Sequence, residues 1–373
     1  MPTRLLNRLT PLCRIILGVT FVLSGFVKVV DPWGTALKVE EYLAIYGFEW
    51  LNRLSMGFSV WLCGAELMMG CMLLFKVRIR LISIFALFSI LFFTILTFLS
   101  ATWLPVEDCG CFGDAVKLSP WGTFAKNLVL LPMAALVWYR YRPDRIFAFR
   151  PVEILLTCLF FSLSMGIGIW CSRHLPLIDF LPYKVGVDLR TAWLNPESER
   201  MDEDREQHET ILVYRNRRTG EVREFALDDP EWQNDELWEW EETRTHFETP
   251  SIRPIISEFA LRDPSGDITE EVLRTEGRLY MICITSFDRV RRGCAHRLRM
   301  LIERADREGA SVLCLTPGPL NEEARHAFLG SRPVRCCNID VHTLKTLLRA
   351  NNGVVVLEDG VITAKMNCRD IPL

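Results

Sequence analysis

The chain has 373 residues, 50% of them hydrophobic, and a formal net charge of -3. No strongly basic face stands out, which argues against a nucleic acid as partner. The length suits two folding units. Apolar residues crowd into the first 171 positions, whereas Asp and Glu concentrate after Asp188. This distribution predicts a half embedded in a lipid bilayer, followed by a polar half.

Five apolar stretches are long enough to cross a bilayer as helices, which takes roughly 20 residues each. They cover residues 12–30, 56–75, 81–103, 122–139 and 152–171. The first is predicted to stay uncleaved, because the residues that follow it offer no small-residue cleavage site.

The basic residues between these stretches predict the orientation. With five spans, three basic groups fall on one side of the membrane, and the opposite loops are poorer in Lys and Arg. The groups are Arg4, Arg8 and Arg14; Lys76, Arg78 and Arg80; and Arg140, Arg142, Arg145 and Arg150. The positive-inside rule then places the N-terminus in the cytoplasm and everything after Cys171 outside. In a bacterium this means the cytoplasmic (inner) membrane, with the second half in the periplasm, where disulfides persist.

The loop between the third and fourth spans contains Cys109-Gly110-Cys111. A disulfide between these cysteines would close a very small ring and would be easily reduced, which favours redox chemistry. Each cysteine could instead pair elsewhere in turn, or the two could only staple the loop. Asp108 and Asp114 oppose reactivity, because anionic neighbours disfavour a thiolate. No metal site is predicted, since zinc requires four ligands.

Ionisable residues inside the predicted spans are costly and suggest function. Glu66 lies midway along the second span, Lys28 near the end of the first, and Lys126 near the start of the fourth. For the two lysines we favour snorkelling to the interface. Glu66 is predicted either to pair with Lys28 or Lys126, or to carry protons for chemistry at the outer face.

Three segments of the first half resemble the DoxX and MauE superfamily of four-helix membrane proteins. They are Ser24–Pro32, Glu66 with Gly70, and Asp108–Gly113, of which the last is most similar to the MauE branch. The resemblance covers residues 8–140 and implies a four-helix bundle, to which this chain adds a fifth span. MauE-like proteins are associated with the maturation of methylamine dehydrogenase, where their proposed role is to support periplasmic disulfide formation. The resemblance implies such a role for this chain, but it does not carry over the substrate. By analogy with quinone-linked thiol oxidases, a quinone would be the cofactor that accepts the electrons.

The second half begins with two segments of different character. Residues 210–215 and 221–225 read as a β-hairpin around Thr219-Gly220, and the acidic, tryptophan-rich stretch 232–240 reads as a solvated surface. The expected domains are a bundle over 1–150, a fifth span with its connector over 151–185, a hairpin-containing linker region over 186–253, and an α/β domain over 254–373.

The last domain alternates strands and helices. Strands are expected at 255–261, 278–286, 311–316 and near Val334, with a terminal hairpin of 354–357 and 362–366; helices are expected at 267–273, 295–308, 321–329 and 341–350. This order, and the stretch 344–362, resemble the thioredoxin fold. The chain departs from that family, because no Cys-x-x-Cys follows the strand at 278–286 and Asn352 occupies the place of the family's cis-proline.

Cys294 is the one cysteine at the predicted start of a helix in this domain, where Arg289, Arg291, Arg292 and His296 surround it. It is a candidate reactive thiol, because such a setting stabilises a thiolate, although the favoured interpretation is an inert cysteine, either buried or at the surface. Cys336 and Cys337 are adjacent, and pairing of one of them with Cys314 or Cys368 is the expected structural disulfide.

Two functions follow from these features. The first is a membrane component supporting thiol–disulfide exchange or electron transfer for the maturation of exported client proteins, with Cys109, Cys111 and Glu66 in the chemistry. The alternative is a non-enzymatic membrane assembly factor, whose degenerate thioredoxin-like domain binds a client. A transporter is disfavoured, since the five spans contain no repeats.

Overall fold

A computed structural model describes residues 3–102, 113, 115, 118–142, 150–194, 207–216, 222–226, 238–248, 259–285, 287, 290–318, 329 and 334–372. The chain divides into two compact units. The first comprises Met1–Val187 and Ala260–Leu373, and the second comprises Asp188–Phe259.

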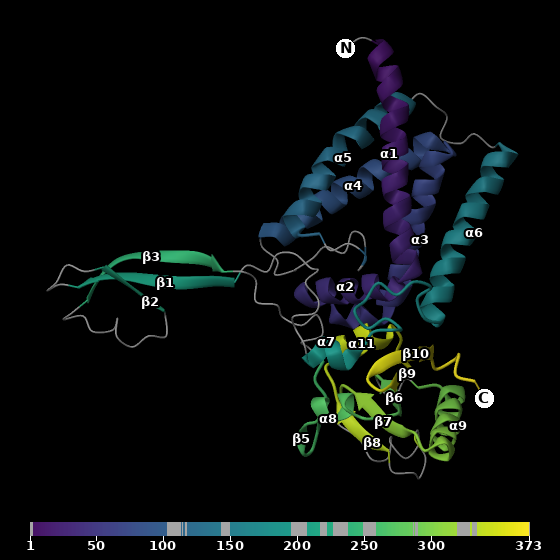
Figure 1. Ribbon diagram of the computed structural model, residues 1–373. Helices are drawn as coiled ribbons and strands as arrows, with labels where there is room; N and C mark the ends of the chain where they lie inside the picture. Colours follow the sequence, from purple (N-terminus) through teal and green to yellow (C-terminus); the bar gives the residue numbers. More distant parts are fainter. Residues whose placement is uncertain are drawn as a thin grey trace. The chain divides into compact units, whose positions relative to one another are not determined.

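Five long helices form the first part of the larger unit (Figure 1). They are α1 (Thr3–Val30), α3 (Ser55–Leu74), α4 (Ile79–Thr102), α5 (Pro120–Tyr141) and α6 (Pro151–Arg173). All five are long and apolar enough to cross a membrane, which confirms the five predicted spans. Large apolar side chains such as Phe88 and Leu155 are exposed on them, as expected for surfaces that face lipid.

Two further elements between α1 and α3 were not predicted. Helix α2 covers Pro32–Ile45, and the 3-10 helix η1 covers Glu49–Leu54. Asp31 caps α2 by accepting a hydrogen bond from Gly34 N at 3.4 Å, and Pro32 begins the helix. This Asp-Pro pair is a recognised helix start signal, so the local sequence did contain the information for α2.

Helices α1 and α3 cross with their backbones nearly in contact. A Cβ atom on Gly25 would lie 2.4 Å from Leu67 N, and one on Gly70 would lie 2.5 Å from Val22 N. Small residues allow such close approach between membrane helices. The crossing places Ser24 and Lys28 of α1 directly against Glu66 of α3.

The C-terminal part of the larger unit is a mixed sheet of order β10-β9-β6-β7-β8-β4-β5. Its strands are β4 (Arg262–Asp263), β5 (Gly266–Asp267), β6 (Arg278–Ile284), β7 (Ser311–Thr316), β8 (Arg335–Asn338), β9 (Asn352–Glu358) and β10 (Val361–Asn367). Strands β6, β7 and β8 are parallel, and β9 runs antiparallel to β6 and to β10.

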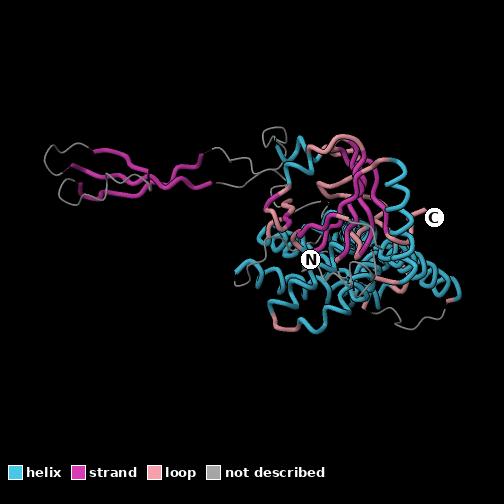
Figure 2. The backbone as a smooth tube through the Cα atoms, turned by 90° about the horizontal axis from the view of Figure 1, so that it is seen from below, coloured by secondary structure: helices cyan, strands magenta, loops and turns pink. Residues whose placement is uncertain are grey.

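Three helices accompany this sheet: α8 (Thr269–Leu273), α9 (Arg292–Glu308) and α11 (Val341–Leu348). Helix α9 packs beside the strands of this sheet (Figure 2). Its residues Leu298 and Ile302 share a buried core with Ile282 and Val354. The helix places its apolar side chains at the spacing expected for an amphipathic helix.

Most expected elements of this domain are confirmed, with boundaries shifted by a few residues. The strand expected at 255–261 is wrong for residues 259–261, which have no regular structure, and the rest of it lies outside the described residues. The helix expected at 321–329 also lies outside them, except for Leu329.

The smaller unit contains α7 (Leu189–Leu194) and an antiparallel sheet of order β2-β1-β3. Strands β1 (Gln207–Asn216) and β2 (Val222–Ala226) form the predicted hairpin. Strand β3 (Trp238–Glu248) pairs with β1 and was missed. The alternation Trp238-Glu-Trp-Glu at its start is a strand pattern, which the interpretation of residues 232–240 as a solvated surface did not include.

The α1–α3 crossing leads to a first prediction. Gly25→Ala should destabilise the bundle by about 1–3 kcal/mol, because the added methyl group meets the α3 backbone. The matched control is Gly57→Ala on α3, where a Cβ atom meets no atom within 4 Å. This variant should be neutral or more stable by up to about 1 kcal/mol. Unfolding of both variants in detergent mixtures, followed by helicity, measures the difference. Equal stabilities would contradict the close crossing.

Candidate functional site in the helix bundle

The candidate site is built around Glu66 on α3. Lys28 Nζ lies 2.8 Å from Glu66 Oε2, and Ser24 Oγ donates a hydrogen bond of 2.6 Å to Glu66 Oε1. Ser24, Lys28 and Glu66 are 5%, 6% and 9% exposed. Both carboxylate oxygens therefore have partners within the helix bundle.

This geometry decides between the interpretations of Lys28. Its ammonium group points at Glu66 and lies 5.9 Å from the centre of the Phe93 ring on α4. The snorkelling interpretation of Lys28 was wrong, and the pairing of Glu66 with Lys28 is confirmed. Ser24 and Lys28 are four residues apart, so they share one face of α1 and hold the carboxylate from two sides.

The end of the cysteine motif lies beside this pair. Gly113, the last residue of the segment Asp108–Gly113, has a left-handed φ of +55°, which favours glycine. A Cβ atom there would lie 3.3 Å from Val27 Cγ1 and 4.0 Å from Lys28 Cγ. Cys109 and Cys111 themselves lie outside the described residues.

Helix α5 contributes two buried polar side chains to the bundle. Thr123 is fully buried and Asn127 is 4% exposed. Thr123 Oγ1 and Asn127 Nδ2 have no hydrogen-bond partner in the described part of the chain. A buried donor without a partner is costly. Both groups could therefore donate to a carbonyl oxygen of a ligand within the bundle.

The C-terminal domain contacts the bundle close to the same site. Arg349 Nε lies 3.0 Å from Asp31 Oδ2, with both side chains almost fully buried. Lys345 Nζ lies 2.8 Å from Glu40 Oε2 on α2. Asp31 follows Lys28 by three residues and lies directly after the end of α1, so the C-terminal domain contacts the chain close to the buried pair.

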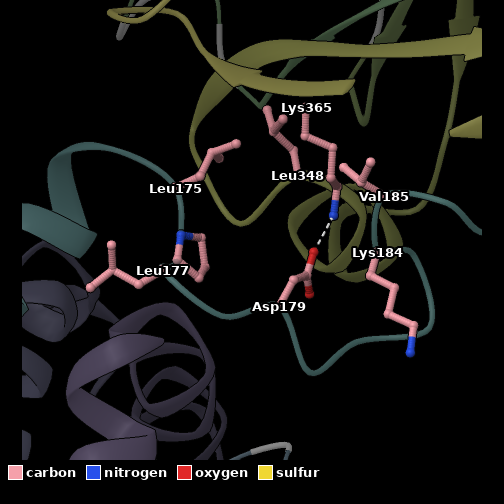
Figure 3. A pocket seen from close by; sticks show the side chains of 8 residues that line it. Leu175, Leu177, Asp179, Lys184, Val185, Leu348 and Lys365 are labelled. Atoms are coloured by element: carbon pink, nitrogen blue, oxygen red, sulfur yellow. Dashed lines mark hydrogen bonds and ion pairs between the residues drawn. The ribbon is translucent and has the colours of Figure 1, made fainter. Parts of the chain in front are cut away.

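The connector after α6 contacts the same domain (Figure 3). Lys365 Nζ lies 2.7 Å from Asp179 Oδ2 at a cavity of about 310 Å³. Burial lowers the pKa of Lys365, and the Asp179 carboxylate opposes that shift. His174, just after α6, lies 2.7 Å from Asp370. Within the described residues, three ion pairs and the contact between His174 and Asp370 thus join the helical and C-terminal parts of this unit. None of these contacts was predicted from the sequence.

The cysteines of the C-terminal domain differ from expectation. Cys294 forms a disulfide with Cys368. Cys294 is therefore not a single free thiol, and the expected pairing of Cys336 or Cys337 with Cys314 or Cys368 was wrong.

The unpaired cysteines of this domain are buried in the sheet; in the described residues they are Cys283, Cys314, Cys336 and Cys337. Burial raises the pKa of Cys283 to about 12 and that of Cys337 to about 11. A hydrogen bond with Cys336, and then burial, raise the pKa of Cys314. Thiols of this kind are unreactive.

Comparison with known proteins identifies the helical part. Residues 6–140 match the model of a family described as methylamine utilisation protein MauE. No curated protein and no solved structure matches the chain. The matched segment contains Ser24, Lys28, Glu66 and Gly113. Together with the five apolar helices, the match indicates a multi-pass membrane protein with a MauE-like N-terminal part.

The buried ion pair gives a second prediction. Lys28→Met should destabilise the bundle by about 3–5 kcal/mol, because it leaves the Glu66 carboxylate buried and unpaired. Adding Glu66→Leu should recover much of this loss. Lys38→Met is the control, because it breaks the more exposed Lys38–Glu41 pair and should cost at most about 1 kcal/mol. A double-mutant cycle in detergent measures the coupling, and strict additivity would contradict it.

Proposed function

We propose that this protein supports thiol–disulfide exchange at the periplasmic face of the bacterial cytoplasmic membrane, in the maturation of exported proteins such as those of methylamine utilisation. One observation carries the proposal. The motif with Cys109 and Cys111 ends at Gly113, which packs on α1 next to the buried Lys28–Glu66 pair. A MauE match spans all of these residues.

The proposed topology has the N-terminus in the cytoplasm. Arg14 donates a hydrogen bond of 2.7 Å to Leu74 O, so the start of α1 and the end of α3 lie at one end of the bundle with the basic groups. Gly113, Asp31 and the C-terminal domain belong to the opposite end. A disulfide in that domain supports an oxidising compartment there.

In the proposed reaction, a client thiolate attacks the Cys109–Cys111 disulfide and forms a mixed disulfide. A second client thiol then attacks the mixed disulfide, which leaves an oxidised client and a reduced Cys109–Cys111 pair with two electrons and two protons. Lys28 and Ser24 hold the Glu66 carboxylate by its two oxygens, and Glu66 is the proposed acceptor of a proton when the thiols are oxidised again.

A quinone is the proposed electron acceptor, by analogy with quinone-linked thiol oxidases. Such a group takes up two electrons and two protons and presents carbonyl oxygens. Thr123 Oγ1 and Asn127 Nδ2 fit it chemically, because they are buried donors that have no partner in the described residues. These two side chains would hold a carbonyl oxygen inside the bundle and keep water from it.

We further propose that the C-terminal domain is thioredoxin-like and receives the client. In support, β6, α9 and β7 form a parallel unit beside the antiparallel hairpin of β9 and β10. Strands β8, β4 and β5 extend that sheet. The competing function is a non-enzymatic assembly factor. In that case the C-terminal domain, which ion pairs hold against the bundle, would bind a client without exchanging disulfides.

The topology yields a third prediction. Cysteines introduced into the Lys76–Arg80 loop should be protected from membrane-impermeant maleimide in whole cells. Cysteines introduced after Cys171, for example at exposed Glu358, should be labelled. Equal protection of both positions would place the C-terminal domain in the cytoplasm and remove the basis for stable disulfides there.

The cysteine pair yields a fourth prediction. Cys109→Ser and Cys111→Ser should each abolish client maturation without reducing protein abundance, because exchange needs one sulfur to attack and one to resolve. One single variant should accumulate a mixed disulfide with the client on non-reducing gels. Glu66→Gln should slow turnover but still allow this trapping.

The control for these variants is Cys158→Ser. Cys158 is an exposed free cysteine on α6, outside the MauE match, and its loss should leave maturation unchanged. Normal maturation in both single variants, with no trapped adduct, would favour the assembly factor, because a staple in so small a loop contributes little stability.

A further inference from the structure

The C-terminal domain contains a disulfide that joins the start of a helix to the end of a strand. Cys294 and Cys368 are bonded across 74 residues, whereas Cys283, Cys314, Cys336 and Cys337 remain as buried free thiols. The disulfide is thus outside the strands: Cys294 is the third residue of α9, and Cys368 directly follows β10.

The two sulfur-bearing residues differ in access. Cys368 is 3% exposed, whereas Cys294 is only partly buried. Gly293, next to Cys294, is exposed, and a Cβ atom there would meet no other atom within 4 Å. An incoming thiolate therefore has open space beside Cys294 and none beside Cys368.

The surroundings of Cys294 stabilise a negative sulfur. No side chain caps the N-terminus of α9, and its first turn contains no acidic residue. Arg291 and Arg292 are exposed at this end of the helix. The nearby acid, Asp370, is paired with His174. A helix N-terminus and cationic neighbours both favour a thiolate over a thiol, which makes the disulfide a better oxidant.

The fold holds both cysteines in place without the S–S bond. Cys368 N donates a hydrogen bond of 3.0 Å to Asn352 O, and Arg297 donates one to Ile371 O. Cys294 lies in a 17-residue helix packed on the sheet. The reduced pair would therefore stay aligned and could reform its bond.

We propose that Cys294–Cys368 is a redox-active disulfide, a second thiol–disulfide exchange site whose substrate is a dithiol of an exported protein. This site does not depend on the function proposed for Cys109 and Cys111. Cys294 is the sulfur that bonds to the substrate, and Cys368 is the buried sulfur that leaves.

The exchange balances in two steps. A substrate thiolate attacks Cys294 Sγ, the Cys294–Cys368 bond breaks, and Cys368 leaves as a thiolate that takes up a proton. The second substrate thiolate then attacks the substrate sulfur of the mixed disulfide and releases Cys294 as a stabilised thiolate. The substrate loses two electrons to the pair, and a second protein disulfide of the same compartment restores it by the reverse exchange.

The test uses the full chain in detergent with Cys109 and Cys111 replaced by Ser, so that failure of the function proposed for those cysteines has no influence. Dithiothreitol is the probe dithiol. Reduction of Cys294–Cys368 is followed by quenching with a maleimide and by mass spectrometry of the peptides. We expect reduction of the folded protein within minutes, and alkylation of reduced Cys294 at pH 7 about tenfold faster than alkylation of glutathione.

Two variants test the cause. Arg291→Glu with Arg292→Glu should slow alkylation of Cys294 at least about tenfold, whereas Arg307→Glu, at the far end of α9, should not. Gly293→Val should slow reduction by dithiothreitol by filling the open space, with the disulfide still formed. Reduction only after unfolding, or alkylation no faster than that of glutathione, would show a structural disulfide and overturn the proposal.

Discussion

The structure of the helical part depends on one buried ion pair, Lys28–Glu66. Two charges in a bilayer are tolerated when they neutralise each other at close range, and this requires α1 and α3 to approach closely. Gly25 and Gly70 permit that approach, because a side chain at either position would collide with the opposite backbone. The two glycines allow the contact that Ser24, Lys28 and Glu66 make. The role of each of these five residues therefore depends on the others.

The same end of α1 also holds the C-terminal domain. Asp31 caps α2 and binds the buried guanidinium of Arg349. Arg349 itself has a left-handed φ of +54° at the end of α11. Strand β9 begins three residues later at Asn352, whose carbonyl oxygen accepts a hydrogen bond from Cys368 N. The buried pair and the sheet are therefore separated by only three residues of chain and one ion pair.

Local patterns made the elements predictable, but not the contacts between them. The five spans and most strands follow from apolar runs of the right length. The partner of Glu66 could be narrowed to two lysines, because both lie at the right depth. The Arg349–Asp31 pair and the Cys294–Cys368 bond had no local signal, since each joins residues that only the tertiary fold brings together. Trp238–Glu248 shows the opposite case, where alternation was present but its acidic residues suggested solvent.

In the described part of the C-terminal domain, the buried free thiols are separate from the disulfide that we propose to be exchangeable. Cys283 and Cys337 are buried in the sheet, with pKa values raised to about 12 and 11, so they cannot compete as nucleophiles at neutral pH. Cys294 occupies a cationic helix start and contacts open space. Oxidation of the domain would therefore be confined to one pair, even with several thiols near one another. The proposed exchange function requires such selectivity, because stray pairing within the core of the domain would disable it.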